Sequence, residues 1–340
     1  MTKELPNLAV LGATGVVGRE ILNILEENDV KYRSIKFLAS KRSAGSTIEF
    51  KGEKHTVIEA KDEVFDDIDI CLASAGGETS KRFAPIAAKK GCVFIDNSSA
   101  FRMEKDVPLV IAGVNDEDLK NHKGIIANPN CSTSQLMLPL KALDEKFKVK
   151  RLIVSTYQAV SGAGLKAINE LTDNTKTNLV GMPFEPSAFK YEIAFNVIPQ
   201  IDSFCENGYT KEEMKVTNET RKILHLSEDV KISCTAVRVP VYIGHSEAVS
   251  VEFENKIDSQ TARELLKNTW GVEVVDDTNN CIYPTPKDAA GKNPVYVGRI
   301  RNSIAFDNGL DFFCVADNLR IGAALNTVRI AQKVIEMQLY

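Results

Sequence analysis

The first third of the chain alternates short apolar runs with helix-like segments, and this alternation restricts the fold more than any other feature. The first apolar run, Asn7 to Leu11, leads into a glycine-rich turn from Gly12 to Gly18 (GATGVVG) and a helix pattern that extends to Glu27. Further strand patterns follow at 34–39, 68–73, 92–95, 109–112 and 125–127, with a short hairpin over 47–58 and a helix at 79–90. Because these runs are almost continuously apolar, they predict a parallel sheet covered by helices on both faces.

The pattern changes after residue 131. Longer strand candidates at 151–159, 194–201, 231–237, 247–253 and 295–300 alternate with helices near 165–177, 211–224 and 259–269. We therefore predict an α/β protein with two domains, an N-terminal Rossmann-type doubly wound domain and an α+β domain with a mixed sheet. The last stretch, 318–338, is typical of one amphipathic helix, which must bury its apolar face, and we expect it to pack on the first domain. The predicted boundaries are 1–130, completed by 318–340, and 131–317.

The composition excludes several classes of partner. The formal net charge of -4 provides no general attraction to nucleic acid or to an anionic membrane, so any anion-binding site must be local. No apolar run approaches the roughly 18 residues of a membrane span, and the start lacks a signal-peptide core, so we expect a cytoplasmic protein. The seven cysteines are scattered without C-x-x-C spacing, which argues against a disulfide framework and against a metal site.

The glycine-rich turn has the features of a dinucleotide site. Its G-x-x-G-x-x-G spacing differs from the usual G-x-G-x-x-G, but a strand pattern directly precedes it and a helix pattern directly follows it. Glycines let the backbone approach a pyrophosphate, which the helix N-terminus attracts. A tight strand-to-helix turn with no ligand is the simpler alternative.

The end of the second strand bears on the choice of cofactor. An NAD-selective site usually carries an acid there, whereas this chain has the run from Ala39 to Ser43 (ASKRS). Because the run offers hydroxyls and cations that suit a 2′-phosphate, we predict NADP as the cofactor. A solvated surface pair of Lys41 and Arg42 is the alternative.

Cys131 is the candidate nucleophile. It lies in the run from Asn128 to Thr133 (NPNCST), between an apolar stretch and a strong helix pattern. At a helix N-terminus, unpaired backbone N–H groups and the helix dipole favour a thiolate. An activated cysteine together with a dinucleotide indicates hydride chemistry on an acyl thioester.

Charged residues elsewhere offer partners for this cysteine. His245 lies at a bend between two strand patterns, and Arg238 points away from its apolar neighbours on an extended strand. Arg102 follows a buried strand, at the end of a sheet where α/β proteins bind ligands. Each also has an ordinary structural interpretation, as a turn histidine or a salt bridge. Glu212 and Lys215 lie one turn apart, which by itself is typical of a solvated pair.

Taken together, these motifs resemble the aspartate-β-semialdehyde dehydrogenase family over essentially the whole chain. The most specific match is Asn130 to Thr133 (NCST), and the segments 97–102 (NSSAFR) and 158–164 (QAVSGAG) and the Arg238 to His245 spacing follow in matching order. The resemblance implies NADPH-dependent reductive dephosphorylation of L-aspartyl 4-phosphate to L-aspartate 4-semialdehyde and phosphate through a cysteine thioester. That reaction belongs to lysine biosynthesis through diaminopimelate, and to threonine and methionine biosynthesis. The resemblance also implies a homodimer, with a second domain that is both catalytic and dimerising.

The resemblance further implies a role for each matching residue. Cys131 would be the nucleophile, His245 the acid/base, and Gln158 would orient the acyl group. Arg238 would hold the substrate carboxylate and Glu212 its amino group, while Arg102 and Lys215 would bind phosphate. The cofactor would be bound by Gly12, Ala13, Thr14, Gly15, Val16, Ser40, Lys41, Arg42, Ser43, Ser161, Gly162 and Asn318.

Several other classes of protein share part of this pattern. N-acetyl-glutamyl-phosphate reductase uses the same cysteine-plus-dinucleotide logic, but that family usually has Gly-Cys-Tyr at the nucleophile. Glyceraldehyde-phosphate dehydrogenase has a Ser-Cys-Thr-Thr-Asn motif that this sequence lacks. A non-catalytic NADP-sensing protein would need the glycine turn alone, and a cysteine hydrolase would bind no cofactor.

Overall fold

A computed structural model describes residues 4–340 and divides the chain into two units. Unit 1 joins the chain up to Asn130 with Ala323–Tyr340, and unit 2 is Cys131–Gly322. Each unit has its own six-stranded sheet, and a separate two-stranded hairpin, β3 (Thr47–Phe50) and β4 (Glu53–Thr56), belongs to unit 1. The protein is therefore an α/β protein with two sheets of different type.

The sheet of unit 1 is parallel throughout and has the order β5-β2-β1-β6-β7-β8. In that order, the strands are Ile58–Glu59, Ser34–Ala39, Asn7–Leu11, Ile70–Ala73, Val93–Asp96 and Ile125–Ala127. The strand order reverses at β1, as in doubly wound nucleotide-binding sheets. In such sheets ligands bind beyond the carboxyl ends of the strands at that reversal, which here is where the glycine turn follows β1.

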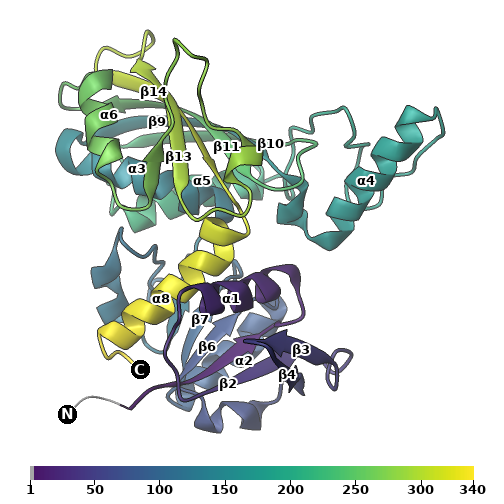
Figure 1. The fold of residues 1–340 in the computed structure, drawn as a ribbon. Helices are drawn as coiled ribbons and strands as arrows, with labels where there is room; N and C mark the ends of the chain where they lie inside the picture. The colour runs from purple at the N-terminus through teal and green to yellow at the C-terminus, as the bar shows by residue number, and fades with distance from the viewer. Residues whose placement is uncertain (1–3) are drawn as a thin grey trace. The chain divides into compact units, whose positions relative to one another are not determined.

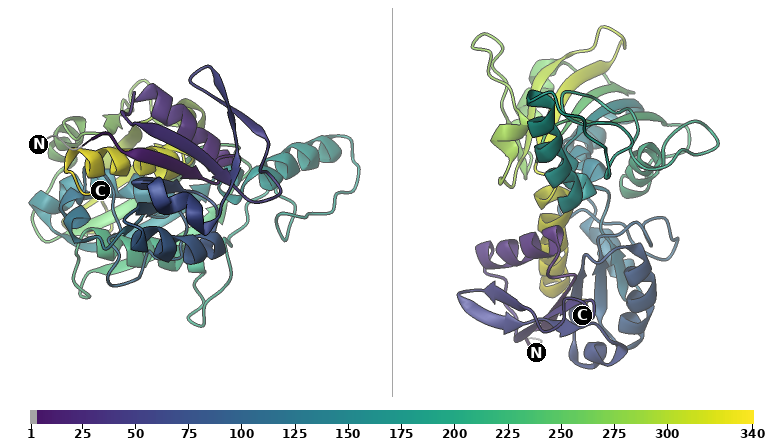
Figure 2. Two further views of the ribbon diagram at one scale, coloured as in Figure 1. Left: turned by 90° about the horizontal axis from the view of Figure 1, so that it is seen from below. Right: turned by 90° about the vertical axis from the view of Figure 1, so that its right-hand side faces the viewer.

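Helices cover both faces of this sheet. The helices α1 (Val16–Glu27) and α8 (Leu325–Glu336) pack together on one side, and α2 (Gly77–Lys89) lies on the other (Figure 2). Apolar residues at Ile21, Ile24 and Leu25 give α1 the one-sided stripe that such packing requires. The C-terminal segment from Ala323 onward belongs to unit 1, whereas residues 318–322, which were predicted to complete the first domain, belong to unit 2.

The turn between β1 and α1 depends on two glycines that allow close approach. Gly12 has a φ of 86°, and a Cβ there would lie 2.3 Å from the Ser74 carbonyl oxygen. A Cβ on Gly18 would lie 2.1 Å from the Gly12 carbonyl oxygen. The helix can therefore start directly against the strand, with its first N–H groups directed at the carboxyl edge of the sheet.

Unit 2 contains a mixed sheet in the order β10-β9-β11-β14-β13-β12. In that order, the strands are Lys231–Arg238, Val149–Gln158, His245–Phe253, Gly309–Ala316, Val295–Asn302 and Val272–Val274. The two outer pairs are parallel and the inner pairs antiparallel. Helices α3 (Cys131–Phe147), α5 (Lys211–Ile223) and α6 (Ser259–Lys267) pack against this sheet, whereas α4 (Leu165–Leu179) lies apart from it (Figure 1).

Three secondary-structure predictions were wrong. Residues 109–112 form only an isolated bridge, between Leu109 and Ala127, because the chain turns back at Ile111. Residues 194–201 form a loop, since Phe195 has a φ of 57° and Pro199 cannot donate to a ladder. The C-terminal α-helix begins only at Leu325, after a π-helical turn over Arg320–Ala324. The sequence analysis also missed β14 and β12.

Candidate functional site

A cleft of about 640 Å³ lies beside the glycine turn of unit 1. Its lining includes Gly12, Thr14 and Gly15 from the turn and the whole segment Ser40–Ser43 after β2. The structure therefore brings most of the predicted cofactor residues of unit 1 around one cavity. Ala13 lies fully buried beneath the turn, where its N–H donates to the Leu38 carbonyl, and Val16 begins α1.

Two features of this cleft escaped the sequence analysis. Thr79 and Arg82 reach it from α2, and Arg82 adds a third cation beside Lys41 and Arg42. Glu59 also lines it, because β5 pairs with β2 in a register that puts Glu59 beside Ala39. An acid therefore does stand at the end of β2, although it lies about 20 residues further along the chain and is separated from β2 by the β3–β4 hairpin.

In unit 2, Cys131 and His245 form the centre of a second candidate site. Cys131 is the first residue of α3, and its Sγ lies 3.2 Å from Nε2 of His245, the first residue of β11. The other ring nitrogen of His245, Nδ1, accepts a hydrogen bond of 3.0 Å from the Ala159 N–H. A neutral imidazole that accepts at Nδ1 carries its proton on Nε2, which here faces the sulfur. Burial, together with the charge of Arg238, lowers the pKa of His245 well below its usual value, so the ring is neutral at pH 7.

The register of the sheet places three predicted residues in one row across neighbouring strands. Arg238 pairs with Gln158, and the pairing of Ser246 with Tyr157 puts His245 on the other side of Gln158. We call Arg238, Gln158 and His245 the catalytic row, after the catalytic and substrate-binding roles that the sequence predicts for them. All three side chains are buried, although they lie up to 87 positions apart in the chain (158 to 245).

Arg238 is held at its end of the row by the backbone. Its Nη1 donates to the Ala159 carbonyl at 2.7 Å, and the guanidinium lies 5.8 Å from the centre of the Phe189 ring. Burial lowers the pKa of Arg238, while Cys131 and Glu212 act in the opposite direction. Ala159 thus fixes two members of the row, since its carbonyl accepts from Arg238 and its N–H donates to His245.

A chain of hydrogen bonds links the row to α5. Gln158 accepts from the Thr156 hydroxyl at 3.1 Å and donates to Glu212 at 3.1 Å. Glu212 also accepts from Lys215 at 3.1 Å, and Lys215 pairs with Asp202 at 2.9 Å. Burial alone would lower the pKa of Lys215, but these two carboxylates outweigh it and raise the pKa. The predicted pair of Glu212 and Lys215 is therefore connected to the row, and Asp202 and Thr156 are members that the sequence analysis missed.

The turn after β9 closes the site from another side. A Cβ on Gly162 would lie 3.2 Å from both Arg238 Nη1 and the His245 ring, so only glycine fits without displacing the row. Asn318 exchanges hydrogen bonds with the Ser161 hydroxyl and accepts from the Gly244 N–H at 3.0 Å. In unit 2, Asn318 therefore joins the Ser161 turn to the turn that precedes His245.

Arg102 belongs to unit 1. Its guanidinium is buried and donates to the backbone carbonyls of Asn97 and Asn128, at 2.9 Å each. The Asn97 side chain accepts in turn from Asn128 and from Thr327. The guanidinium is thus held by the loops that follow β7 and β8, at the carboxyl edge of the sheet.

Both parts of the chain match models of known protein families. Residues 7–122 match "Semialdehyde dehydrogenase, NAD binding domain" and residues 140–321 match "Semialdehyde dehydrogenase, dimerisation domain". An aspartate-semialdehyde dehydrogenase from Aquifex aeolicus is 52% identical over 97% of this chain and 98% of its own length. The chain belongs to the aspartate-semialdehyde dehydrogenase family.

Solved structures of this family share the fold. Aspartate semialdehyde dehydrogenase II from Vibrio cholerae, in a structure described as complexed with ASA, aligns with a TM-score of 0.95 at 44% identity, over 98% of this chain and 99% of that one. The family member from Candida albicans, whose structure is described as with NADP, aligns with a TM-score of 0.77 at 26% identity, over 99% of this chain and 100% of that one.

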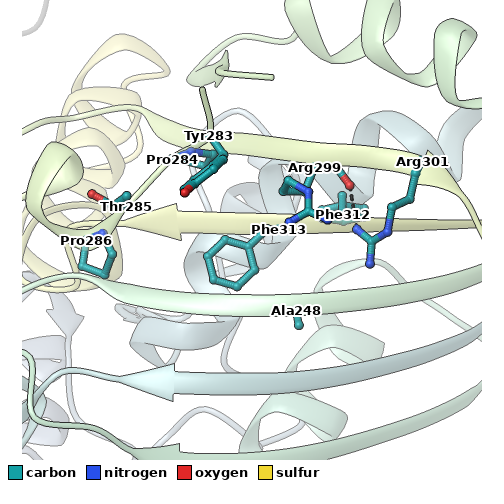
Figure 3. Close-up of a pocket in the computed structure, with 9 residues that line it drawn as sticks. All are labelled: Ala248, Tyr283, Pro284, Thr285, Pro286, Arg299, Arg301, Phe312 and Phe313. Carbon is teal, nitrogen blue, oxygen red and sulfur yellow. Dashed lines mark hydrogen bonds between the residues drawn. The ribbon is translucent and has the colours of Figure 1, made fainter. Parts of the chain in front are cut away.

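The dimerisation domain of this family member has a further cavity on the other face of its sheet. The cavity, of about 440 Å³, is lined by outward-facing Ala248 and Phe313, by Tyr283, and by Arg299 and Arg301 (Figure 3). Ala248 and Phe313 pair across β11 and β14 and point away from the catalytic row, because successive strand residues alternate between faces. This cavity is therefore separate from the catalytic row.

The described residues include no helix that is long and apolar enough to cross a membrane. Among residues 4–340, no group of three or more histidine, cysteine and acidic side chains is placed to hold a metal ion.

Proposed function

We propose that this family member reduces L-aspartyl 4-phosphate to L-aspartate 4-semialdehyde and phosphate with NADPH, through a thioester on Cys131. The observation that carries the proposal is the 3.2 Å contact between Cys131 Sγ and His245 Nε2 at the N-terminus of α3, beside a buried arginine. An acyl phosphate is a good acylating agent, so a thiolate displaces phosphate with modest help. Two steps of lower barrier then replace one difficult step.

The protein residues favour sulfur in its anionic form. The first N–H groups of α3 and the Arg238 guanidinium both favour negative charge at Cys131. Sulfur attacks the acyl carbon, the carbon–oxygen bond to phosphate breaks, and phosphate leaves with the bonding electron pair. The tetrahedral oxyanion formed on the way is stabilised by backbone N–H groups near Cys131.

His245 acts mainly as a hydrogen-bond donor to sulfur. For His245 to accept the thiol proton at Nε2, its own proton would have to move to Nδ1 and point at the Ala159 N–H, which already donates there. In the observed geometry the Nε2 proton stabilises the thiolate before attack. It stabilises the same sulfur again when the hemithioacetal collapses and sulfur leaves as thiolate. We propose this donor role for His245 in place of the general acid/base role that the resemblance implies.

The remaining residues of unit 2 hold the substrate. Arg238 binds the substrate α-carboxylate with its planar fork, and Glu212, in contact with Gln158, binds the amino group. Gln158 orients the acyl group from the centre of the row. Lys215 binds the phosphate, and the same role for Arg102 of unit 1 stays a prediction.

The cleft of unit 1 fits a nicotinamide dinucleotide. Gly12 and Gly18 leave room that a Cβ would fill, and the N-terminus of α1 favours a pyrophosphate. Lys41, Arg42 and Arg82 supply positive charge for a 2′-phosphate, which supports NADP. When bound, NADPH supplies the hydride that reduces the thioester. A cofactor-binding role for Ser161, Gly162 and Asn318 of unit 2 stays a prediction.

We also propose that the protein is a homodimer. The sheet face opposite the catalytic row exposes Ile153 and Tyr157 and carries the cavity of Figure 3. Apolar side chains are also exposed after α4, at Val180, Met182 and Phe195. A second copy of the chain would cover these surfaces. A cytoplasmic location and a role in lysine, threonine and methionine biosynthesis, including the diaminopimelate branch, stay predictions.

Phosphate-dependent oxidation of aspartate semialdehyde, run with NADP and NAD in parallel, tests the function. We expect oxidation to require phosphate and to be faster with NADP at limiting cofactor. Oxidation that proceeds equally well without phosphate would contradict an acyl-phosphate product. N-acetyl-glutamate semialdehyde is the control substrate, and preferential turnover of it would point to the related reductase.

A further inference from the structure

A second row of buried side chains lies directly beneath the catalytic row. Thr156 pairs with Glu247 across β9 and β11, and Glu247 pairs with Cys314 across β11 and β14. Thr156 lies two residues before Gln158, and Glu247 lies two residues after His245. Cys314 lies two residues before Ala316, the cross-strand partner of His245. Because alternate residues of a strand share a face, all three side chains point to the same face as the catalytic row. Thr156, Glu247 and Cys314 are all fully buried.

Glu247 is unusual in this row because it is a carboxyl group in an apolar setting. Within the described residues, neither of its carboxyl oxygens makes a hydrogen bond. The Gln135 side chain also lacks hydrogen bonds, since neither its Nε2 nor its Oε1 has a partner among residues 4–340. Four buried polar atoms without partners would each cost free energy in a dry core.

The two side chains lie against each other. The Gln135 amide is close enough to the Glu247 carboxyl to oppose part of the pKa rise that burial imposes on it. The backbone carbonyl oxygen of Gln135 also accepts a hydrogen bond from the Cys314 thiol at 3.8 Å, and Cys314 is the cross-strand partner of Glu247. The helix α3 thus places Gln135 directly over the second row.

Spacing along the helix and the strand brings the two pairs into register. Gln135 follows Cys131 by four residues, a rise of about 6 Å on one helix face. Glu247 follows His245 by two residues, a rise of about 6.7 Å on one strand face. The contact of Gln135 with Glu247 therefore lies one helical turn along α3, and two residues along β11, from the contact of Cys131 with His245. Both contacts join the same helix and strand.

We propose that Glu247 is a positioning residue: as a neutral carboxylic acid it forms a reciprocal pair of hydrogen bonds with Gln135, and this pair sets the distance between Cys131 and His245. The carboxyl O–H donates to Gln135 Oε1, and Gln135 Nε2 donates to the carboxyl C=O, so all four unpartnered atoms are satisfied. An ionised carboxylate has no proton to donate and would leave Gln135 Oε1 unpaired. The inference rests on the proposed roles of Cys131 and His245.

The surroundings of Glu247 favour the neutral form. The titratable groups around it are His245 on its own strand, the thiols of Cys314 on β14 and Cys234 on β10, and the carboxyls of Glu212 and Glu213 on α5, which act on Cys234 together with Glu247. Burial raises the pKa of both thiols, and burial and Arg238 keep the imidazole neutral. Arg238 is the one cation among the groups named here, and the pKa of Glu247 is governed instead by burial, which raises it, and by Gln135, which opposes part of that rise.

The variants Glu247→Gln and Glu247→Leu separate this proposal from a purely structural role. Glutamine can pair reciprocally with Gln135 through two amides, so we expect kcat and KM within about threefold of wild type. Leucine cannot pair, and we expect kcat to fall about ten- to a hundredfold with KM little changed, because the nucleophile is misplaced. Gln135→Leu should give a similar loss, and the double variant Gln135→Leu/Glu247→Leu no greater loss than either alone.

Two readouts do not depend on turnover. The rate at which iodoacetamide alkylates Cys131 as a function of pH should match wild type in Glu247→Gln and shift in Glu247→Leu. The wild-type infrared spectrum should contain a carbonyl band from a buried protonated carboxyl, and this band should disappear in Glu247→Gln. Val249→Ala is the matched control, because it creates a cavity at a buried position two residues further along β11. This variant should lower the free energy of unfolding and leave the pH dependence of the Cys131 alkylation rate unchanged.

The proposal is overturned if Glu247→Gln loses activity as fully as Glu247→Leu, since the ionised group or its proton would then be required. It is also overturned if Glu247→Leu keeps the wild-type kcat and alkylation profile, or if the infrared band is absent in wild type. A failure of the proposed function alone would look different. The alkylation and infrared results would then hold, while no phosphate-dependent turnover would be found.

Discussion

The cleft of unit 1 and the catalytic row of unit 2 are built in opposite ways. The cleft is lined by backbone and by exposed side chains such as Lys41 and Arg42, each free to change without disturbing the others. The row consists of buried side chains in fixed positions: Ala159 holds Arg238 and His245. Gln158 is held between Thr156 and Glu212. A dinucleotide is long and presents charge at several points, so it can be bound by separate contacts. A sulfur atom that must reach one carbon needs neighbours fixed within about half an ångström.

The comparison predicts its largest effect at the nucleophile. Cys131→Ala should lower turnover by about four orders of magnitude or more, because the site loses the sulfur atom that is proposed to carry the acyl group. NADPH affinity, measured by calorimetry, should stay unchanged, since the cleft belongs to unit 1. Cys281→Ala, which removes an exposed thiol, is the matched control. Near-normal turnover by Cys131→Ala would remove this residue from the chemistry.

A smaller loss is expected at His245, and two variants distinguish its roles. His245→Ala should lower kcat by about a hundredfold or more. His245→Gln should recover part of that loss, because an amide N–H can still donate to sulfur although it cannot take up a proton at pH 7. Steady-state kcat values provide the comparison. If glutamine were no better than alanine, the donor role proposed for Nε2 would be wrong.

Arg238→Lys should change substrate binding more than chemistry. A lysine has a single point charge in place of a planar fork, so we expect KM for aspartate semialdehyde to rise about tenfold or more. The kcat should fall less, because lysine still provides a positive charge near the sulfur. Arg33→Lys, an exposed arginine of unit 1 paired with Glu4, serves as the control. An unchanged KM would remove Arg238 from the carboxylate site.

In the cleft the effects should be local and modest. Lys41→Ala/Arg42→Ala should weaken NADP by about tenfold and NAD much less, because only NADP carries the 2′-phosphate. Glu59→Gln should do the reverse and weaken NAD more, since a carboxylate suits a ribose 2′-hydroxyl. The dissociation constants of NADP and NAD, measured for each variant, show whether these residues select between the two cofactors. Lys54→Ala on the β3–β4 hairpin is the control. Equal losses for the two cofactors would exclude a selective role.

The smallest effect concerns stability and pH. Burial holds the pKa of Glu247 well above its usual value, so the native state keeps a proton that the unfolded state loses above about pH 4.3. The free energy of unfolding should therefore fall as pH rises, by up to about 1.4 kcal/mol per pH unit, until the native carboxyl ionises. Glu247→Gln lacks this contribution. Urea midpoints that run parallel for both proteins between about pH 5 and pH 8 would contradict a neutral Glu247.

Sequence patterns predicted most of the fold of unit 1, because its elements follow from local signals. The glycine turn, the strand β1 and the stripe of α1 are all contiguous in the chain. The errors arose where tertiary context decides, as at 194–201, where apolar residues lie in a loop that carries Pro199. The strand β14 was missed although it forms the centre of the second sheet.

The candidate site shows the same division. Cys131 stands out locally, because a polar turn with a cysteine opens an apolar helix pattern. The neighbours Thr156, Asp202 and Glu247 carry no local signal, since only sheet register and helix packing bring them beneath or beside the row. Glu59 was missed for the same reason, because only the pairing of β5 with β2 places it at the end of β2.

The central claim is that Cys131 is transiently acylated by the substrate. Mass spectrometry of enzyme mixed with aspartyl phosphate in the absence of NADPH tests it most directly. We predict an aspartyl adduct, mapped by peptide analysis to the segment that contains Cys131 and absent from Cys131→Ala. An adduct on another side chain, or phosphate release with no adduct at all, would contradict this account.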